Sequence, residues 1–226
     1  MIYITGDTHR DFTRLNNMKF YKDDMLIILG DSGINYSLTI EDYDVKDHLN
    51  KLGIKIFCIR GNHEERPENI ETYEESNLFG GKVFIEKDYP NLIFAKDGEE
   101  YNIYGKSVLV IGGAYSVDKD YRLMYGYKWF KDEQLTKEEM YNIYNKVKGK
   151  HYDIVLTHTC PYKYEPVEVF LGGIDQSRVD KSMELFLDKI EESINYDKWY
   201  CGHFHTEKII DKVEFMFERV RILNVY

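Results

Sequence analysis

The stretch "IYITGDTH", residues 2–9, joins an apolar run to a turn that carries an aspartate and a histidine. Residues 2–5 are β-branched or aromatic, which favours a buried strand. Gly6 permits a sharp turn at the strand's end, so that Asp7 and His9 follow at once. The pattern recurs along the chain, and strands that end in polar side chains bring those side chains to one edge of a sheet.

Apolar runs of the same kind predict further strands. Together with the first run they lie at 2–5, 26–29, 54–59, 107–111 and 153–157, with a weaker one at 198–201. Because these runs are continuously apolar rather than alternating, they suit a sheet that is covered on both faces.

The spacing of apolar residues predicts helices over 136–148 and 177–194, with Thr136 and Ser177 as their caps. Other elements are expected to be shorter: a helix ending near Gly53, solvated acidic helix faces at 41–47 and 73–76, and small strands and turns over 82–104 and 208–226. Strands that alternate with helices predict a layered α/β architecture with the helices outside. We expect a single domain over residues 1–226.

Side chains that bind metals follow five of these strands. They are Asp7, His9, Asp31, Asn62, His63, His158, His203 and His205. Carboxylate, amide and imidazole groups suit Mn, Fe, Zn or a similar divalent ion, and no cysteine pair has the spacing of a structural zinc site. The set is larger than one ion needs, which predicts two divalent metal ions about 3.5–4 Å apart. Asp31 is the candidate for the bridging carboxylate, and His203 and His205 are expected to reach different ions.

Each of these residues also has a simpler interpretation when it is taken alone. Asp7 and Asp31 could cap the turns after their strands, Asn62 could be a turn residue, and His158 could be a hydrogen-bonded core imidazole. The coincidence of all of them at strand ends favours the metal site.

Composition limits the classes of protein to which the chain can belong. Its 226 residues are 43% hydrophobic, enough for one well-buried core. The formal net charge of −10 repels nucleic-acid backbones at long range, so nucleic acid would need a local basic groove. The three cysteines, the absence of signal-peptide features in "MIYITGDTHR" and the lack of an apolar run of roughly 20 residues indicate a cytoplasmic protein with no membrane partner. The sequence sets no oligomeric state.

In chain order, the motifs "GDTH", "GD", "GNHE", "THTCP" and "GHFH" lie between residues 6 and 205. Together they resemble the calcineurin-like metallophosphoesterase superfamily, in a bacterial or phage-type form. The resemblance implies a four-layer αββα sandwich and a metal-dependent phosphoesterase. It also implies two ligand sets that share one residue: Asp7, His9, Asp31 and His205 for one ion, and Asp31, Asn62, His158 and His203 for the other.

The mechanism implied by this resemblance uses a hydroxide, shared by the two ions that Asp31 bridges, to attack phosphorus in line. His63 binds no metal in the family and protonates the leaving group. In many relatives the second aspartate of a Gly-Asp-x-x-Asp box orients this histidine, and here Ile34 takes that place. Asn35 or Glu64 could substitute, and we expect Glu64 to hold His63 or a metal ligand through a hydrogen bond.

Signals for the substrate lie in the long aromatic segment 112–134 and in two arginines. Arg10 and Arg122 could each bind a phosphate through a bidentate fork. Three aromatic residues of the segment could stack on a ring of the substrate or pack on the rim: Tyr115, Tyr121 and Trp129. A phosphorylated small molecule and a phosphodiester both stay open. "RGNHE" resembles phosphoprotein phosphatases, but their Gly-Asp-x-x-Asp-Arg-Gly box is absent.

Two other functions compete with the phosphoesterase. The missing aspartate at position 34, where this chain has Ile34, would suit a catalytically impaired, metal-containing binding or regulatory module. A purely structural metal site is the third alternative, although such a site rarely needs ligands from five segments.

Overall fold

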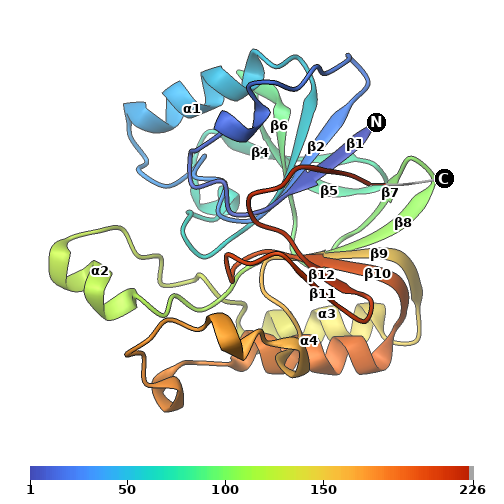
Figure 1. The fold of residues 1–226 in the computed structure, drawn as a ribbon. Helices are drawn as coiled ribbons and strands as arrows, with labels where there is room; N and C mark the ends of the chain where they lie inside the picture. Colours follow the sequence, from blue (N-terminus) through green and yellow to red (C-terminus); the bar gives the residue numbers. More distant parts are fainter. Residues whose placement is uncertain (224–226) are drawn as a thin grey trace.

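The computed structural model describes residues 1–223 as two mixed β-sheets packed face to face between helices (Figure 1). The described part of the first sheet has the strand order β13-β1-β2-β3-β6-β5-β4. Its strands are β1 (Ile2–Thr5), β2 (Met25–Leu29), β3 (Lys55–Ile59), β4 (Tyr73–Leu78), β5 (Gly81–Glu86), β6 (Tyr89–Ala95) and β13 (Arg221–Ile222). Neighbouring strands among β1, β2, β3 and β6 pair in parallel.

The second sheet has the order β11-β12-β10-β9-β8-β7. Its strands are β7 (Glu100–Ile103), β8 (Lys106–Ile111), β9 (His151–Thr157), β10 (Asn195–Cys201), β11 (Lys208–Ile210) and β12 (Val213–Phe215). Strands β8, β9, β10 and β12 are parallel, so this sheet too has several carboxyl ends at one edge.

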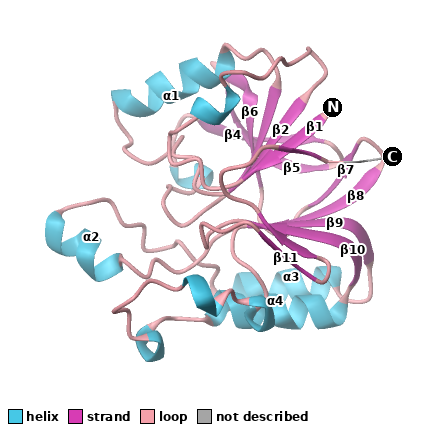
Figure 2. Cartoon of the chain, viewed as in Figure 1, coloured by secondary structure: helices cyan, strands magenta, loops and turns pink. Residues whose placement is uncertain are grey.

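Helices cover the outer faces of both sheets. Helix α1 (Ile40–Asn50) lies on the first sheet, and α3 (Lys137–Val147) and α4 (Ser182–Ser193) lie on the second (Figure 2). Helix α2 (Lys119–Tyr125) extends away from the layers on the side to which the parallel strands point. Short 3₁₀ turns occur at Thr13–Leu15, Pro67–Asn69, Tyr162–Tyr164, Val167–Val169 and Gln176–Arg178. None of the described helices combines the length and the apolar character that a bilayer crossing requires.

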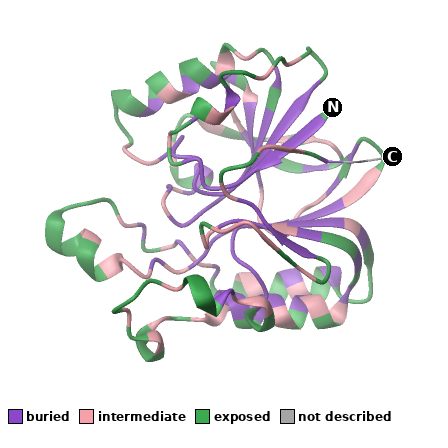
Figure 3. Ribbon diagram, viewed as in Figure 1, coloured by how far each residue is buried: buried purple, intermediate pink, exposed green. Residues whose placement is uncertain are grey.

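Alternating side chains of each central strand enter two different cores. In β2, Ile27 packs between the two sheets, whereas Leu26 and Ile28 pack beneath α1. In β9, Ile154 and Leu156 face the first sheet and Val155 faces α3 and α4. Both faces of these strands are therefore apolar, which explains the continuous runs, and Figure 3 shows the central strands as the most buried part of the fold.

The layered α/β sandwich that the sequence predicts is confirmed, with helices on the outside. The six predicted strands correspond to β1, β2, β3, β8, β9 and β10. The capping box at α3 is present, since Thr136 Oγ1 accepts from the Glu139 N–H at 3.2 Å and Glu139 Oε2 accepts from the Thr136 N–H at 2.6 Å.

Two local predictions are wrong. The helix expected from 177 begins only at Ser182, because the Asp175 carboxylate accepts hydrogen bonds from the N–H and hydroxyl of Ser177 and holds a separate turn. The segment 73–76 is not a helix face but part of β4, which pairs with β5 at the edge of the first sheet. Acidic side chains are a common feature of edge strands, because they discourage pairing with another chain.

Candidate active site

The carboxyl ends of five parallel strands meet where the two sheets face each other. The turns after β1, β2 and β3 come from the first sheet, and those after β9 and β10 come from the second. These turns bring together all the residues that the sequence predicts as metal ligands, together with His63: Asp7, His9, Asp31, Asn62, His158, His203 and His205.

The backbone at this edge is unusually strained. Within residues 1–223, ten residues other than glycine have positive φ, and five of them belong to the predicted ligand set: Asp7, His9, Asp31, His203 and His205. Such conformations cost free energy and persist where a functional constraint holds them. Glycines allow close approach: a Cβ at Gly30, where φ is 86°, would lie 2.1 Å from His158 Nδ1, and one at Gly61 would lie 2.0 Å from Asp31 Oδ1.

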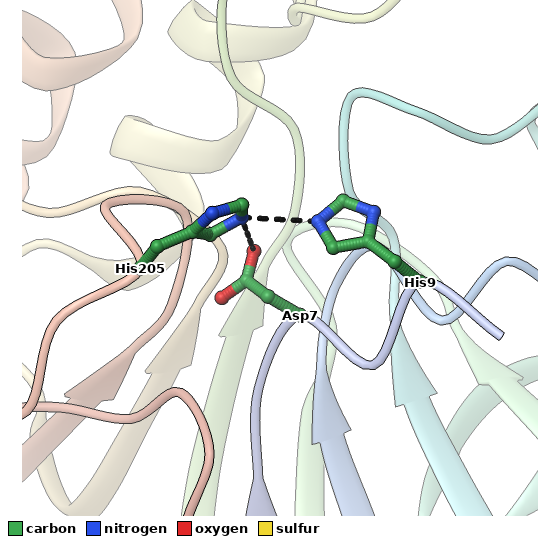
Figure 4. A group of neighbouring side chains, drawn as sticks. All are labelled: Asp7, His9 and His205. Carbon is green, nitrogen blue, oxygen red and sulfur yellow. Dashed lines mark hydrogen bonds and ion pairs between the residues drawn. The ribbon is translucent and has the colours of Figure 1, made fainter. Parts of the chain in front are cut away.

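One group of ligand atoms consists of Asp7, His9 and His205, whose polar atoms point toward one another in Figure 4. The Nε2 atoms of His9 and His205 are 3.0 Å apart, and His205 Nε2 is 3.7 Å from Asp7 Oδ1. Asp7 Oδ2 accepts from the backbone N–H of His203 at 2.8 Å, whereas the buried Oδ1 has no hydrogen-bond partner among the described residues. An unpartnered carboxylate oxygen beside two imidazoles fits a cation.

A second group surrounds His158. Its Nδ1 is 2.8 Å from the carbonyl oxygen of Leu29, so Nδ1 carries the ring proton and Nε2 keeps its lone pair. Nε2 is 2.8 Å from Asn62 Oδ1 and 3.6 Å from Asp31 Oδ1, and the His203 ring lies beside it with centroids 5.0 Å apart. The neutral ring therefore directs its lone pair at two oxygen acceptors, an arrangement that a cation between them would stabilise.

The orientation of the Asn62 amide supports this description. Ser116 Oγ donates to Glu133 Oε2 at 2.5 Å, so the same oxygen accepts from Asn62 Nδ2 at 2.8 Å. This chain of hydrogen bonds leaves Asn62 Oδ1 facing His158. Ser116 and Glu133 were not singled out from the sequence, since their contact with Asn62 joins three distant segments.

Asp31 lies between the two groups. Its Oδ2 is 3.8 Å from His9 Nε2, and its Oδ1 is 3.6 Å from His158 Nε2. Oδ1 also accepts from the backbone N–H of His63 at 2.8 Å, which fixes the carboxylate. The two oxygens thus face different imidazoles.

The electrostatics of the cluster also favour cations. Burial lowers the pKa of His9 to about 4 and lowers the pKa values of His158, His203 and His205, so these rings are neutral near pH 7. Burial and the neighbouring Asp31 carboxylate raise the pKa of Asp7. Neutral imidazoles and mutually repelling carboxylates are a donor set that divalent ions satisfy.

His63 lies beside the cluster with its two nitrogens in different surroundings. Nδ1 is 3.0 Å from Arg122 Nη2 and 3.5 Å from Asp31 Oδ2, whereas Nε2 is 3.6 Å from Asp118 Oδ1. An arginine offers only donors, so this contact makes Nδ1 an acceptor and places the ring proton on Nε2. Arg122 Nε donates to Asp118 Oδ2 at 2.8 Å, so the two residues bracket the ring as a linked pair. Asp118 was not predicted to be part of the site.

Asn35 and Glu64, the residues expected to replace the missing aspartate, have hydrogen-bond partners other than the His63 ring in the described structure. Asn35 Oδ1 accepts from the Tyr73 hydroxyl at 3.1 Å. The buried Glu64 accepts from Ser32 Oγ at 2.6 Å and from the Gly61 N–H at 2.8 Å, so it joins the turns after β2 and β3. The predicted hydrogen bond from Glu64 to His63 or to a ligand side chain is therefore wrong, because the carboxylate turns toward the backbone that carries the ligands.

The arginines of the sequence analysis have different environments. Arg10 forms ion pairs with Glu41 and Asp42, and like Arg122 it lines the region beside His63. Arg60, in "RGNHE", is only 2% exposed and binds Asp97 at 2.9 Å. Arg60 thus forms a structural ion pair and is not a phosphate ligand.

Two cavities flank His63. The side cavity, of about 290 Å³, is largely apolar and includes Asp118 and Tyr115 in its wall. The arginine cavity, of about 240 Å³, is lined by Arg10, Arg122, His9 and Tyr36. Tyr121 and Trp129 line neither of them. The Tyr121 ring packs at a tilt against Tyr125 and stacks on Tyr127. The Lys119 ammonium lies 3.9 Å from the Trp129 ring centroid.

Comparison with models of known families identifies a match over most of the chain. A family model described as calcineurin-like phosphoesterase matches residues 1–207, which include every residue of the cluster. No curated protein matches the chain.

Proposed function

Because the chain belongs to the calcineurin-like phosphoesterase family, we propose that it hydrolyses phosphate esters with two divalent ions and with His63 as the general acid. The observation that carries this proposal is the position of Asp31, whose oxygens face His9 on one side and His158 on the other. A carboxylate in that position can bridge two ions, which Mn, Fe, Zn or a similar metal would provide.

The two groups of side chains divide the work of holding the ions. Asp7, His9 and His205 would hold one, Asn62, His158 and His203 would hold the other, and Asp31 would serve both. When bound, such ions neutralise charge on the phosphate oxygens and make water a better nucleophile at neutral pH. The rigid turns keep the ligand atoms in place, so little reorganisation is needed during the reaction.

His63 would act as an acid in its imidazolium form, whose second proton sits on Nδ1 near the Asp31 carboxylate, and would give up the proton on Nε2, the nitrogen that faces Asp118. Burial disfavours this charged form, but the Asp31 and Asp118 carboxylates outweigh burial and raise the pKa of His63. Asp118 lines the side cavity and Arg122 lines the arginine cavity, so the two nitrogens of His63 lie near residues of different cavities. A leaving oxygen on the side-cavity face of His63 is placed to receive the Nε2 proton, and the phosphate oxygens lie toward Arg122. Asp118 and Arg122 act as positioning residues for the ring.

The alternative of an impaired binding or regulatory module rests on the residue at Ile34. Ile34 is buried in the core beneath α1 and takes no part in the cluster. Asp118 supplies a carboxylate beside the His63 ring from a different segment. The isoleucine at position 34 is therefore weaker support for lost catalysis.

A first experiment compares 4-nitrophenyl phosphate with bis(4-nitrophenyl) phosphate, using protein stripped with a chelator and then reconstituted with Mn²⁺, Fe²⁺ or Zn²⁺. We expect turnover only after reconstitution, with a higher kcat/KM for the monoester, because one of the two cavities is apolar and the site offers one place for an organic group. A faster diester would assign the activity to a phosphodiesterase. No turnover of either ester with any of the metals would contradict the proposal.

The role of Asp118 can be tested through the leaving group. In Asp118→Asn, we expect kcat for esters of simple alcohols to fall roughly tenfold or more, part of the 10²–10⁴-fold that general acid catalysis provides. The loss for 4-nitrophenyl phosphate should be much smaller, because 4-nitrophenolate leaves without a proton.

Asp120→Asn is the matched control, since Asp120 is an exposed residue in the first turn of α2, two positions after Asp118. If Asp118→Asn slows both kinds of ester equally, Asp118 supports the loop but does not position the acid.

A further inference from the structure

The side cavity opens directly beside the cluster, and away from the cluster its wall is built from large apolar side chains. Those used in the argument are Tyr115, Phe170, Leu171, Ile174, Val179 and Phe204. Its volume of about 290 Å³ is at the small end of the range for sites that bind small molecules. A folded protein or a long strand of nucleic acid would not fit inside it.

We propose that the side cavity binds the organic group of the substrate, and that this group is an uncharged planar ring. The inference rests on the proposed function and deepens it, since it names the class of ester: a small phosphate ester of an alcohol that carries an aromatic or heteroaromatic ring.

The first support is an aromatic wall attached to the ligands themselves. Phe204 separates His203 from His205 in the sequence, and its ring stacks with Phe170 at 6.0 Å between centroids and 16° between planes. Phe204 also packs edge-on against Phe215 of the core, so its orientation is fixed. A planar ring stacks well on such a surface, and an alkyl chain gains less from it.

Another residue of the cavity wall, Lys181, helps to hold Phe170 in position. The Lys181 ammonium lies 4.7 Å from the centroid of the Phe170 ring and pairs with the Glu165 carboxylate at 2.6 Å. Lys181 contributes the one ammonium or guanidinium group of the described cavity wall, and Glu165 neutralises it. The cavity therefore offers no free positive charge for a polyphosphate or a second phosphate group, which favours an uncharged occupant.

The second support is Glu184, a buried carboxyl group in the wall of this apolar space. Glu184 is 3% exposed, and its Oε1 accepts from the Thr159 hydroxyl at 2.7 Å. Its Oε2 has no hydrogen-bond partner among the described residues. Burial raises the pKa of Glu184 to about 7, so a neutral carboxyl is available near neutral pH to pair with a polar atom on a ring. An unpaired buried carboxyl oxygen is costly, and a polar atom on a bound ring would satisfy it.

The experiment separates the ring from the reactivity of the ester. It compares 2-phenylethyl phosphate with butyl phosphate, two monoesters of primary alcohols with similar leaving groups. The non-hydrolysable 2-phenylethylphosphonate and butylphosphonate serve as binding probes in calorimetry with the full chain loaded with Mn²⁺. We expect the ring to raise kcat/KM and affinity roughly tenfold, because it buries about as much apolar surface in the cavity as one aromatic side chain does in a protein core.

The variant Phe170→Ala removes half of the aromatic wall without touching a residue of the cluster. We expect kcat/KM to fall much further for 2-phenylethyl phosphate than for butyl phosphate, so that most of the preference for the phenylethyl compounds is lost. Leu185→Ala, at a 48% exposed residue next to Glu184 in α4, is the matched control and should retain the preference.

Equal rates and affinities for the phenylethyl and butyl compounds would overturn the inference while leaving the phosphoesterase proposal in place. A preference that survives in Phe170→Ala would overturn it as well. If no ester is hydrolysed, including 4-nitrophenyl phosphate, the proposed function fails, and the phosphonate affinities still show whether the cavity selects a ring.

Discussion

Asp31→Asn is expected to bind no more than one metal ion per chain, against the two that we propose for the wild type, and to lose about 10³-fold or more in kcat. The reason is the position of Asp31 between His9 and His158, each of which faces one carboxylate oxygen. An asparagine keeps one acceptor oxygen and replaces the other with an NH₂ donor, which cannot bind a cation. A metal ion contributes several kcal/mol to transition-state stabilisation, and each 1.4 kcal/mol is worth about tenfold in rate.

Metal content is measured by mass spectrometry after reconstitution and gel filtration, and kcat is measured on the same samples. The asparagine can still accept from the His63 N–H through Oδ1, so the turn after β2 should be retained. Asp44→Asn, at an exposed residue of α1, is the control for a lost carboxylate. An Asp31→Asn protein with two ions and wild-type turnover would contradict the bridging role, and a wild-type chain with one ion would contradict the dinuclear site.

The location of the cluster could be predicted from sequence because it follows from local patterns. In β2, both neighbours of Ile27 are also apolar, and this continuous character shows that the strand is covered on two faces. Parallel strands of that kind have their carboxyl ends at one edge, so residues such as Asp31 and His158, far apart in the chain, become neighbours. The glycines at these ends mark close approach, as Gly61 does against Asp31.

Other features depend on packing between distant segments, which no local pattern encodes. Asp118 comes from the long segment after β8, and its place beside His63 results from how that segment crosses the edge of the sheets. Glu64 is next to His63 in the sequence, yet its carboxylate turns away to Ser32. Adjacency in sequence was therefore a poor guide to the partner of the His63 ring.

The first residue of a helix was predictable only where no other side chain binds the capping residue. The acidic residues before Thr136 have partners elsewhere, since Asp132 accepts from Asn69 and Glu133 accepts from Ser116. Thr136 therefore forms the capping box that the sequence indicates. Ser177 has the same cap-like character, but the carboxylate of Asp175 binds it first and delays α4 to Ser182. The charges of 73–76 indicated exposure correctly but not the type of element, since an edge strand and a helix face are both solvated.

His63→Gln is expected to lose about 10²–10⁴-fold in kcat for esters of simple alcohols, the range that general acid catalysis provides. The loss should be smaller for 4-nitrophenyl phosphate, whose leaving group needs no proton. The metal content should stay at two ions per chain. Nδ1 of His63 is 3.5 Å from Asp31 and close enough to join a ligand group with His9, so a fall in metal content would instead make His63 a metal ligand.

The double variant His63→Gln/Asp118→Asn tests whether the two residues act as one unit. In our proposal Asp118 affects the reaction only through the His63 ring, so removing Asp118 from a protein that lacks His63 should cause no further loss of rate. Residues that act through one another give strongly non-additive effects, whereas independent residues give losses that multiply. Multiplied losses would mean that Asp118 contacts the substrate itself, and an unchanged rate in His63→Gln alone would remove the general acid from the mechanism.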